Sequence, residues 1–349
     1  MNEILLIAKL IVVFLAAFLF IKLIIRFAPI VGLVDIPNHR SSHKVVTPRG
    51  AGIGIIFGVM ISDLLFLNNL VVTHFTTFLA IFIVFVVGVL DDHRDASAKT
   101  KFYVIFAAVL LLAYDGLIVH SLGHLFGYQI SLGWVAIPFT MFAVAGFTNA
   151  LNLSDGLDGL AGTLSMIILS TLALIGYEND DFFIVSTALS FIAAILAFMW
   201  FNWNPAKIFM GDSGSLTLGF VISVLGIKSL EYINPISILF IAAIPIVDTF
   251  IVMIRRKRTG HSIFAPDKLH IHHILLRFFN GNVRKTVILI ALLQIGFSIV
   301  GVAFSEVHQQ RYILILFIVN IAAFYLLLNG MMERQNKFSY YRKKKWGRQ

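Results

Sequence analysis

The chain contains no cysteine, which excludes disulfides and thiolate chemistry. Charged residues are scarce, at 13% of 349 positions, whereas 59% of the residues are apolar and the mean hydropathy is +0.91. Internal repeats, low-complexity tracts and linkers that would separate two domains are also absent. A soluble protein does not need so many apolar residues, so the composition indicates a polytopic membrane protein.

Apolar runs of about 20 residues, long enough to cross a bilayer as helices, recur along the whole sequence. Because backbone groups in lipid must be hydrogen-bonded internally, we expect an all-α fold. The first run contains Lys9 and Lys22 and no small-residue cleavage site, which predicts a retained helix. We predict one transmembrane domain over 1–331, a basic tail over 332–349, and about 11 transmembrane helices at 3–25, 51–69, 76–90, 102–119, 131–150, 159–176, 183–201, 214–228, 235–254, 286–304 and 311–331.

Lysine and arginine are distributed unevenly between the two sets of loops. Most of the 27 basic residues fall in alternate loops and in the tail, while the opposite connections hold Lys228 and Arg311 beside several acids. The positive-inside rule then places the N-terminus outside and the tail and all polar motif loops in the cytoplasm. The net charge of +9 is thus concentrated at one membrane face, where it attracts anionic lipid and phosphorylated ligands. We expect no nucleic-acid partner.

Five polar stretches interrupt the apolar sequence and hold the candidate functional residues. Asp91 and Asp92 end the third predicted span. Adjacent carboxylates repel each other unless a cation or a proton lies between them. Mg²⁺, with Mn²⁺ as a substitute, is the hard cation that carboxylates commonly share with substrate phosphates. The alternative is a charged helix end at the headgroup level.

Two further stretches combine acids, amides and glycines. In 149–159, Ser154 or Asp155 could simply cap the next helix, but amides in or beside a span are costly without partners, which favours a functional loop. In 201–215, an aromatic residue, two amides and an acid suggest a nucleotide pocket with a metal ligand. Phe209 as a headgroup-belt aromatic and Ser213 as a helix cap remain alternatives.

The last two stretches are basic or rich in histidine. Residues 35–52 carry donors and glycines suited to phosphate, whereas Arg255–Arg258 is typical of a positive-inside stop signal. Three histidines follow within 270–273, in a spacing that lacks the i, i+4 pairing of helical zinc sites. Phosphate binding or orientation of an acid is therefore the preferred interpretation.

Five motifs in this order resemble those of the polyprenyl-phosphate N-acetylhexosamine-1-phosphate transferases, a bacterial superfamily, over nearly the whole chain. They are the glycine loop at Pro48–Gly54, the pair Asp91-Asp92, the Asn-Leu-x-Asp-Gly-x-Asp-Gly segment, Phe-Met-Gly-Asp-x-Gly-Ser and His-x-His-His. The histidine motif and the tail resemble the WecA/TagO branch more than MraY, and Ala51 replaces a glycine usual in the first loop. Members of the superfamily transfer a sugar 1-phosphate from a UDP-sugar to undecaprenyl phosphate, with Mg²⁺ and release of UMP, at the cytoplasmic leaflet of the bacterial inner membrane.

The resemblance implies roles for individual residues. Asp91, Asp92 and Asp155 would be catalytic, and Asp212 together with Asp92 would hold the metal. Phe209 would stack on uracil. The substrates would be bound by Lys44, Arg49, Asn152, Asp158, Asn202, Phe209, His270, His272 and His273.

The implied partners are a UDP-N-acetylhexosamine, undecaprenyl phosphate and membrane lipid, with a homodimer left open. We expect GlcNAc 1-phosphate as the transferred group and a cell-surface glycan, such as O-antigen or teichoic acid, as the polymer that is initiated. The Ser41–Lys44 stretch suggests a deoxy sugar such as FucNAc or QuiNAc as an alternative, and a MurNAc-pentapeptide donor is another.

Two alternatives concern the reaction mechanism and the class of membrane protein. A phosphate monoester is already largely a dianion at neutral pH, which favours direct attack on the sugar-linked phosphorus over an aspartyl-phosphate intermediate. A transporter is the alternative from another class, but its ionisable groups would lie near the bilayer midplane. Here the acids cluster at span ends, with Asp63 as the exception.

Overall fold

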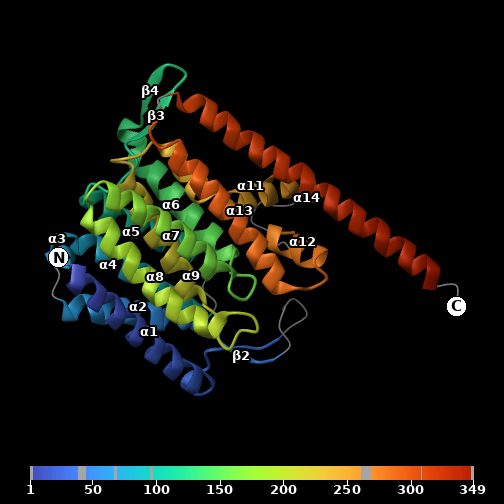
Figure 1. Ribbon diagram of the computed structural model, residues 1–349, viewed down its shortest axis with the longest axis horizontal. Coiled ribbons are helices and arrows are strands. Elements are labelled where there is room, and N and C mark those ends of the chain that lie inside the picture. Colours follow the sequence, from blue (N-terminus) through green and yellow to red (C-terminus); the bar gives the residue numbers. More distant parts are fainter. Residues whose placement is uncertain are drawn as a thin grey trace.

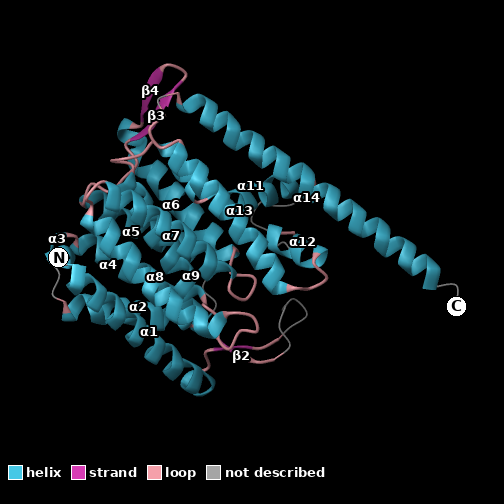
Figure 2. Ribbon diagram, viewed as in Figure 1, coloured by secondary structure: helices cyan, strands magenta, loops and turns pink. Residues whose placement is uncertain are grey.

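The structure is a computed structural model of the chain and describes residues 3–37, 45–66, 69–94, 97–260, 269–307 and 309–346. Helices dominate it, which confirms the all-α fold class (Figures 1 and 2). Two short antiparallel strand pairs, β1–β2 and β3–β4, lie in loops. The elements are α1 (Glu3–Val31), β1 (Val34–Asp35), β2 (Thr47–Pro48), α2 (Ala51–Leu65), α3 (Asn69–Thr73), α4 (Phe75–Arg94), α5 (Ala98–Tyr114), β3 (Ser121–Leu125), β4 (Tyr128–Ser131), a 3₁₀ turn (Gly133–Val135), α6 (Ala136–Leu153), α7 (Leu160–Glu178), α8 (Phe182–Asn202), α9 (Asp212–Ser229), α10 (Pro235–Ile241), α11 (Ala243–Arg258), α12 (Ile271–Phe278), α13 (Val283–Ala303) and α14 (Gln310–Trp346).

Seven helical segments among the described residues are long and apolar enough to cross a membrane, and the bent pair α10–α11 is an eighth if it forms one span. The predicted number of about 11 is therefore not confirmed. The difference lies in α2, α5 and α9, which have 15, 17 and 18 residues. These helices begin with glycine, lysine or hydroxyl residues of the motif stretches, so their apolar parts are shorter.

The central helix of the bundle is α9, which is buried along most of its length and packs against α2, α4, α6 and α7. Glycines allow its backbone to approach its neighbours closely. A Cβ atom placed on Gly52 would lie 2.0 Å from the backbone nitrogen of Gly214, and one on Gly88 would lie 2.6 Å from the carbonyl oxygen of Asp212. Small residues at such crossings are typical of helix packing in membranes. They bring the start of α2 and the C-terminal part of α4 onto the start of α9.

The predicted span at 235–254 is interrupted, because α10 and α11 are separate helices bent by 86°. The bend is stabilised by Gln294 of α13, which is fully buried. Its Oε1 accepts the backbone N–H of Ile244 at 3.0 Å, and its Nε2 donates to the carbonyl oxygen of Ile241 at 2.7 Å. A broken helix in a membrane needs such partners for the freed backbone groups.

Asp63, an acid inside a predicted span and apart from the motif stretches, is packed against α1. Its carboxylate forms an ion pair with Lys9 at 2.7 Å, and Lys9 is only 1% exposed. Lys9 also donates to Ser186 Oγ at 3.0 Å. These contacts join α1, α2 and α8, and they explain how a lysine is accommodated inside the first span.

The C-terminal helix α14 continues to Trp346, beyond the predicted end of the span at 331, and projects from the bundle (Figure 1). No proline or glycine follows residue 330 before this point, so nothing in the sequence interrupts the helix. The predicted boundary between domain and tail therefore falls inside a single helix.

Candidate active site

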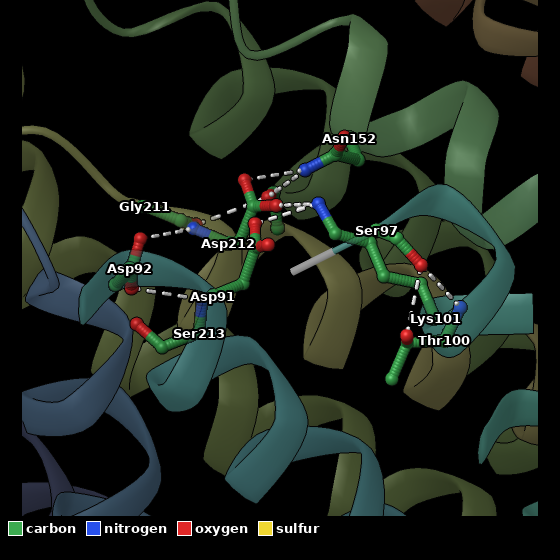
Figure 3. A network of polar contacts seen from close by, with 10 residues as sticks. Asp91, Asp92, Ser97, Thr100, Lys101, Asn152, Gly211, Asp212 and Ser213 are labelled. Carbon is green, nitrogen blue, oxygen red and sulfur yellow. Dashed lines mark hydrogen bonds and ion pairs between the residues drawn. The ribbon is translucent and has the colours of Figure 1, made fainter. Parts of the chain in front are cut away.

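The predicted acids of two different helices meet at the amino group of Lys101 (Figure 3). Asp91 lies in the last turn of α4, and its Oδ2 forms an ion pair with Lys101 Nζ at 2.6 Å. Asp212 is the first residue of α9, and its Oδ2 contacts the same Nζ atom. Although burial opposes the charge, the two carboxylates raise the pKa of Lys101. The lysine thus provides the cation that two close carboxylates require.

Asp92 lies beside this cluster but has a different set of contacts. Its Oδ1 and Oδ2 accept the backbone N–H groups of Asp212 and Ser213 at 2.8 and 3.0 Å, so the carboxylate satisfies free donors at the start of α9. Gly211 has a φ of +75°, which favours glycine. A Cβ atom at this position would lie 2.6 Å from the Asp92 carboxylate. The metal-ligand role of Asp92 stays a prediction.

A side-chain contact between α6 and α9 and a cap on α5 fix the helices that supply the other groups. Asn152, near the end of α6, donates from Nδ2 to Asp212 Oδ1 at 2.9 Å and to Ser215 Oγ at 2.8 Å, which leaves its Oδ1 available. Ser97 caps α5 by accepting the backbone N–H of Thr100 at 3.2 Å. This cap sets the start of α5 and thereby the place of Lys101 (Figure 3).

The loop between α6 and α7 carries Asp155 next to the cluster. Burial, together with the negative charges of Asp212, Asp92 and Asp158, raises the pKa of Asp155 to about 7. A carboxyl group that titrates near neutral pH can exchange a proton under physiological conditions. The predicted catalytic role of Asp155 is therefore chemically reasonable, and it stays a prediction.

Asp158 and Asn202 connect the acid loop to the segment that follows α8. Asp158 Oδ2 accepts the Nδ2 group of Asn204 at 2.8 Å and the backbone N–H of Ala206 at 3.0 Å. Asn202 accepts the backbone N–H of Gly159 and donates to the carbonyl oxygen of Ile208, each at 2.8 Å. Both side chains thus have partners within the protein, and their contact with a nucleotide stays a prediction.

The glycine loop lies against the segment that contains Phe209. The backbone N–H of Phe209 donates to the carbonyl oxygen of Pro48 at 2.8 Å, and the N–H of Ala51 donates to the carbonyl oxygen of Phe209 at 3.1 Å. Arg49 is half-buried in this loop, and its Nε atom is buried without a hydrogen-bond partner among the residues that the structure describes. Lys44 lies outside the described residues. The arrangement brings Arg49 and Phe209 into one region.

The three histidines lie at the start of α12 and differ in their surroundings. Burial lowers the pKa of His272 to about 3, so its ring is neutral at physiological pH. Its Nε2 atom is buried against Gly156, where a Cβ atom would lie only 2.3 Å away, and has no hydrogen-bond partner in the described part of the chain. The rings of His272 and His273 are 4.2 Å apart, while His270 contacts Asp248 of α11. The histidine segment therefore packs on the acid loop.

Lys101 and Asp248 are the two residues of this region that the sequence analysis missed. Lys101 was visible only as one of several basic residues in a cytoplasmic loop. Asp248 lies inside a predicted span, and an acid at such a place is itself a signal of function. Nothing in the order of residues along the chain, however, indicates which partner either side chain meets.

The fold and the site define a multi-pass membrane protein whose acids, amides and lysine converge at the ends of its helices. Comparison with known proteins gives the family. The model of glycosyl transferase family 4 matches residues 74–230. A "probable undecaprenyl-phosphate N-acetylglucosaminyl 1-phosphate transferase" of Bacillus subtilis (strain 168) is 38% identical over 302 residues, which cover 85% of this chain and 84% of that protein.

Two further relatives carry the name "undecaprenyl-phosphate alpha-N-acetylglucosaminyl 1-phosphate transferase". The protein of Yersinia pestis is 34% identical over 86% of this chain and 85% of its own length. The protein of Escherichia coli (strain K12) is 32% identical over 93% of this chain and 91% of its own length. The chain belongs to glycosyl transferase family 4, and the resemblance inferred from its motifs is confirmed.

Proposed function

We propose that the protein transfers an N-acetylhexosamine 1-phosphate, with GlcNAc 1-phosphate preferred, from a UDP-sugar to undecaprenyl phosphate and releases UMP. The observation that supports this proposal most directly is the meeting of Asp91 and Asp212 at Lys101, with Asn152 donating to Asp212. Carboxylates, an amide and an ammonium group at the ends of membrane helices suit a reaction between a lipid phosphate and a soluble diphosphate. The names of the three relatives support the same reaction.

A divalent cation fits the residues present. Among the residues that the structure describes, no three His, Asp or Glu side chains are arranged to hold a metal ion. Mg²⁺, however, is usually bound by one or two carboxylates together with substrate phosphates. We propose that Asp91 and Asp212 would hold Mg²⁺, with Mn²⁺ as a substitute, and that the side-chain oxygen of Asn152, whose amide nitrogen donates to Asp212, would assist. When bound, the ion would neutralise charge on the diphosphate.

The protein's own groups must bring two anions together. Lys101 carries a positive charge at the acid cluster and would pair with a phosphate oxygen. Asp91 would position the acceptor phosphate, and Asp155 could take up a residual proton because its pKa is about 7. In the direct reaction, a lipid phosphate oxygen forms a bond to the sugar-linked phosphorus as the bond to the oxygen of UMP breaks.

One assay tests the reaction and the sugar. Purified protein with Mg²⁺ and undecaprenyl phosphate should release UMP from UDP-GlcNAc, and faster than from UDP-FucNAc, UDP-QuiNAc or UDP-MurNAc-pentapeptide. A preference for one of the latter donors would revise the sugar, while absence of UMP release with every donor would reject the reaction. Retention of ³²P on the protein when a β-³²P-labelled donor is supplied without acceptor would indicate the aspartyl-phosphate route instead.

Localisation follows from the same proposal. We place the protein in the bacterial inner membrane, with the N-terminus outside and the site and the C-terminus in the cytoplasm, where the donor is available. The transporter alternative predicts ion or solute flux in proteoliposomes that does not depend on a UDP-sugar. The lysine-bridged cluster at helix ends argues against it, since transport sites lie near the midplane.

A further inference from the structure

We infer that Asp248 is a positioning residue of the proposed transferase, which orients His270 and, through it, the histidine segment against the acid loop. This inference rests on the proposed function. Asp248 belongs to α11, beyond the residues 74–230 that the family model matches, and none of the sequence motifs includes it.

Asp248 and His270 form a buried pair. Asp248 Oδ2 lies 2.9 Å from His270 Nδ1, and Asp248 Oδ1 accepts the backbone N–H of Ile271 at 2.7 Å. Asp248 and His270 are each only 4% exposed. Because Nδ1 is committed to the carboxylate, Nε2 is the ring nitrogen left for a ligand. The contact therefore decides how His270 can interact with a substrate.

A second residue on the same face of α11 binds Leu269, the residue that precedes His270. Arg255 lies seven residues, or about two turns, after Asp248, and its NH1 group donates to the carbonyl oxygen of Leu269 at 2.7 Å. Three consecutive residues, 269–271, are thus bound by α11. The place of α11 itself depends on the 86° bend that precedes it.

From the Asp248–His270 pair, side-chain packing extends to the loop that carries Asp155. The ring of His270 is nearly parallel to that of His272, with centroids 5.7 Å apart and an interplanar angle of 11°. His272 in turn packs against Gly156, the neighbour of Asp155. A loss of the Asp248 contact would free His270 and loosen the packing of His272 on the loop that carries Asp155.

The carboxylate is specifically required at this position. Its two oxygens accept from two different donors, the His270 ring and the Ile271 backbone. An amide has one oxygen and one NH₂ group, so Asp248→Asn would either leave one donor unpaired or force His270 to accept at Nδ1 and move its proton to Nε2. The substitution changes the orientation or tautomer of His270 with almost no change in volume.

The chain offers a matched control in Asp181, which caps α8. Asp181 Oδ1 accepts the backbone N–H of Ile184 at 3.0 Å, and Oδ2 accepts the hydroxyl of Tyr232 at 2.9 Å. Asp181 is 9% exposed and also binds a donor with each of its two oxygens, and Lys228 Nζ lies 3.7 Å from Oδ2. It lies one helix length, about 30 Å, from the end of α8 that reaches the site. Asp181→Asn should cost stability but not catalysis.

The experiment measures UMP release and thermal unfolding in detergent for wild type, Asp248→Asn, His270→Gln, the double variant and Asp181→Asn. We expect Asp248→Asn to lower kcat/KM by about 10- to 100-fold, as for other residues that orient a functional histidine. In the His270→Gln background the same change should cost less than about threefold, because the partner through which it acts is missing. Both Asn variants should unfold at similar temperatures.

The outcomes distinguish failure of the positioning role of Asp248 from failure of the proposed function. Additive losses in the double variant, or a loss with Asp248→Asn no greater than with Asp181→Asn, would overturn the positioning role while the proposed function stands. If Asp248→Asn does not fold, Asp248→Glu provides the test, since it keeps two acceptor oxygens and should be more active than a folded His270→Gln. If wild type releases no UMP from any donor, the proposed function fails, and the inference fails with it.

Discussion

Lys101 gives the acid cluster its cation, and its removal should therefore affect both stability and activity. Without the ammonium group, the carboxylates of Asp91 and Asp212 repel each other in a half-buried site. We expect Lys101→Met to lower the rate of UMP release by about 100-fold or more and to lower the unfolding temperature in the presence of a chelator.

The same variant provides a test for the divalent cation. Mg²⁺ should raise the unfolding temperature of Lys101→Met more than that of wild type, because it can replace the missing positive charge. Lys99→Met is the control, since Lys99 is exposed two residues earlier on the same helix. If Mg²⁺ raised the unfolding temperatures of the two variants equally, Lys101 would not be the cation of the acid cluster.

Asp155 should make stability depend on pH in a defined direction. Its pKa is raised to about 7, so the folded protein keeps a proton that the unfolded chain releases near pH 3.8. The free-energy cost of ionising Asp155 in the folded protein is absent below pH 3.8, grows as the pH rises toward 7 and persists above pH 7. Asp155→Asn removes this cost.

We therefore expect the unfolding temperature of Asp155→Asn to exceed that of wild type by an amount that increases between pH 5 and pH 8, at roughly 2–4 °C per kcal/mol. The measurement is a series of thermal unfolding curves in chelator, because a bound cation would favour the carboxylate. A difference between the two proteins that stays constant over this range would contradict the assigned environment of Asp155.

At the residue scale, three members of the acid cluster could be proposed from the sequence because each motif is local. Asp91, Asn152 and Asp212 were each recognisable as polar residues next to an apolar run, and the structure brings them together. Lys101 could not be singled out, because its importance depends on α5 lying beside α4 and on its side chain reaching Asp212 at the start of α9. The Asp248–His270 pair likewise depends on a tertiary contact across 22 residues.

The bend between α10 and α11 is an element whose stability depends on one side chain. Gln294 is bonded to backbone groups on both sides of the break. We expect Gln294→Leu to reduce the free energy of unfolding by roughly 2 kcal/mol or more, since two buried backbone groups lose their partners. Asn320→Leu is the control, because Asn320 is half-buried on α14 and donates to the carbonyl oxygen of Leu316 in its own helix. Thermal unfolding in detergent should separate the two variants clearly.

The crossing of α4 and α9 allows a second prediction for an element. A Cβ atom on Gly88 would lie 2.6 Å from the backbone of Asp212 and Ser213. Gly88→Ala should therefore push the start of α9 away from Asp91, with a cost of about 1–3 kcal/mol and a clear loss of activity. Gly296→Ala on α13, where nothing lies within 4 Å, should have neither effect. Equal activity of the two variants would show that the spacing of α4 and α9 is not critical.

The helices themselves were only partly predictable from hydropathy. Long, uniformly apolar segments such as α1 and α8 were located well, because their composition alone determines that they span a membrane. The break before Ala243 was not detected, since it is stabilised by a residue of α13, some 50 positions later in sequence. The length of α14 was underestimated because hydropathy marks where apolar residues end and does not mark where a helix ends.

At the scale of the whole molecule, α5 and α6 determine which parts of the protein lie on opposite sides. Lys101 lies near the start of α5 and Asn152 near the end of α6, and both belong to the acid cluster. The β3–β4 hairpin connects the other ends of these two helices. Together with the 3₁₀ turn before it, α6 has 21 residues that are apolar enough to cross a membrane, a length of about 30 Å that matches the hydrocarbon core. The hairpin and the site should therefore lie on opposite faces of the membrane.

The absence of cysteine allows this arrangement to be tested without removing any native residue. Gln129 on β4 and Lys207 near the site are both exposed. In spheroplasts, a maleimide that does not cross membranes should label Gln129→Cys but not Lys207→Cys, and inverted vesicles should give the reverse pattern. Both variants should retain UMP release, which shows that the labelled protein is folded. Labelling of both positions from one side would place the hairpin and the site on the same face and contradict the arrangement, whereas reversed labelling would keep the arrangement and move the site outside the cell, away from its proposed donor.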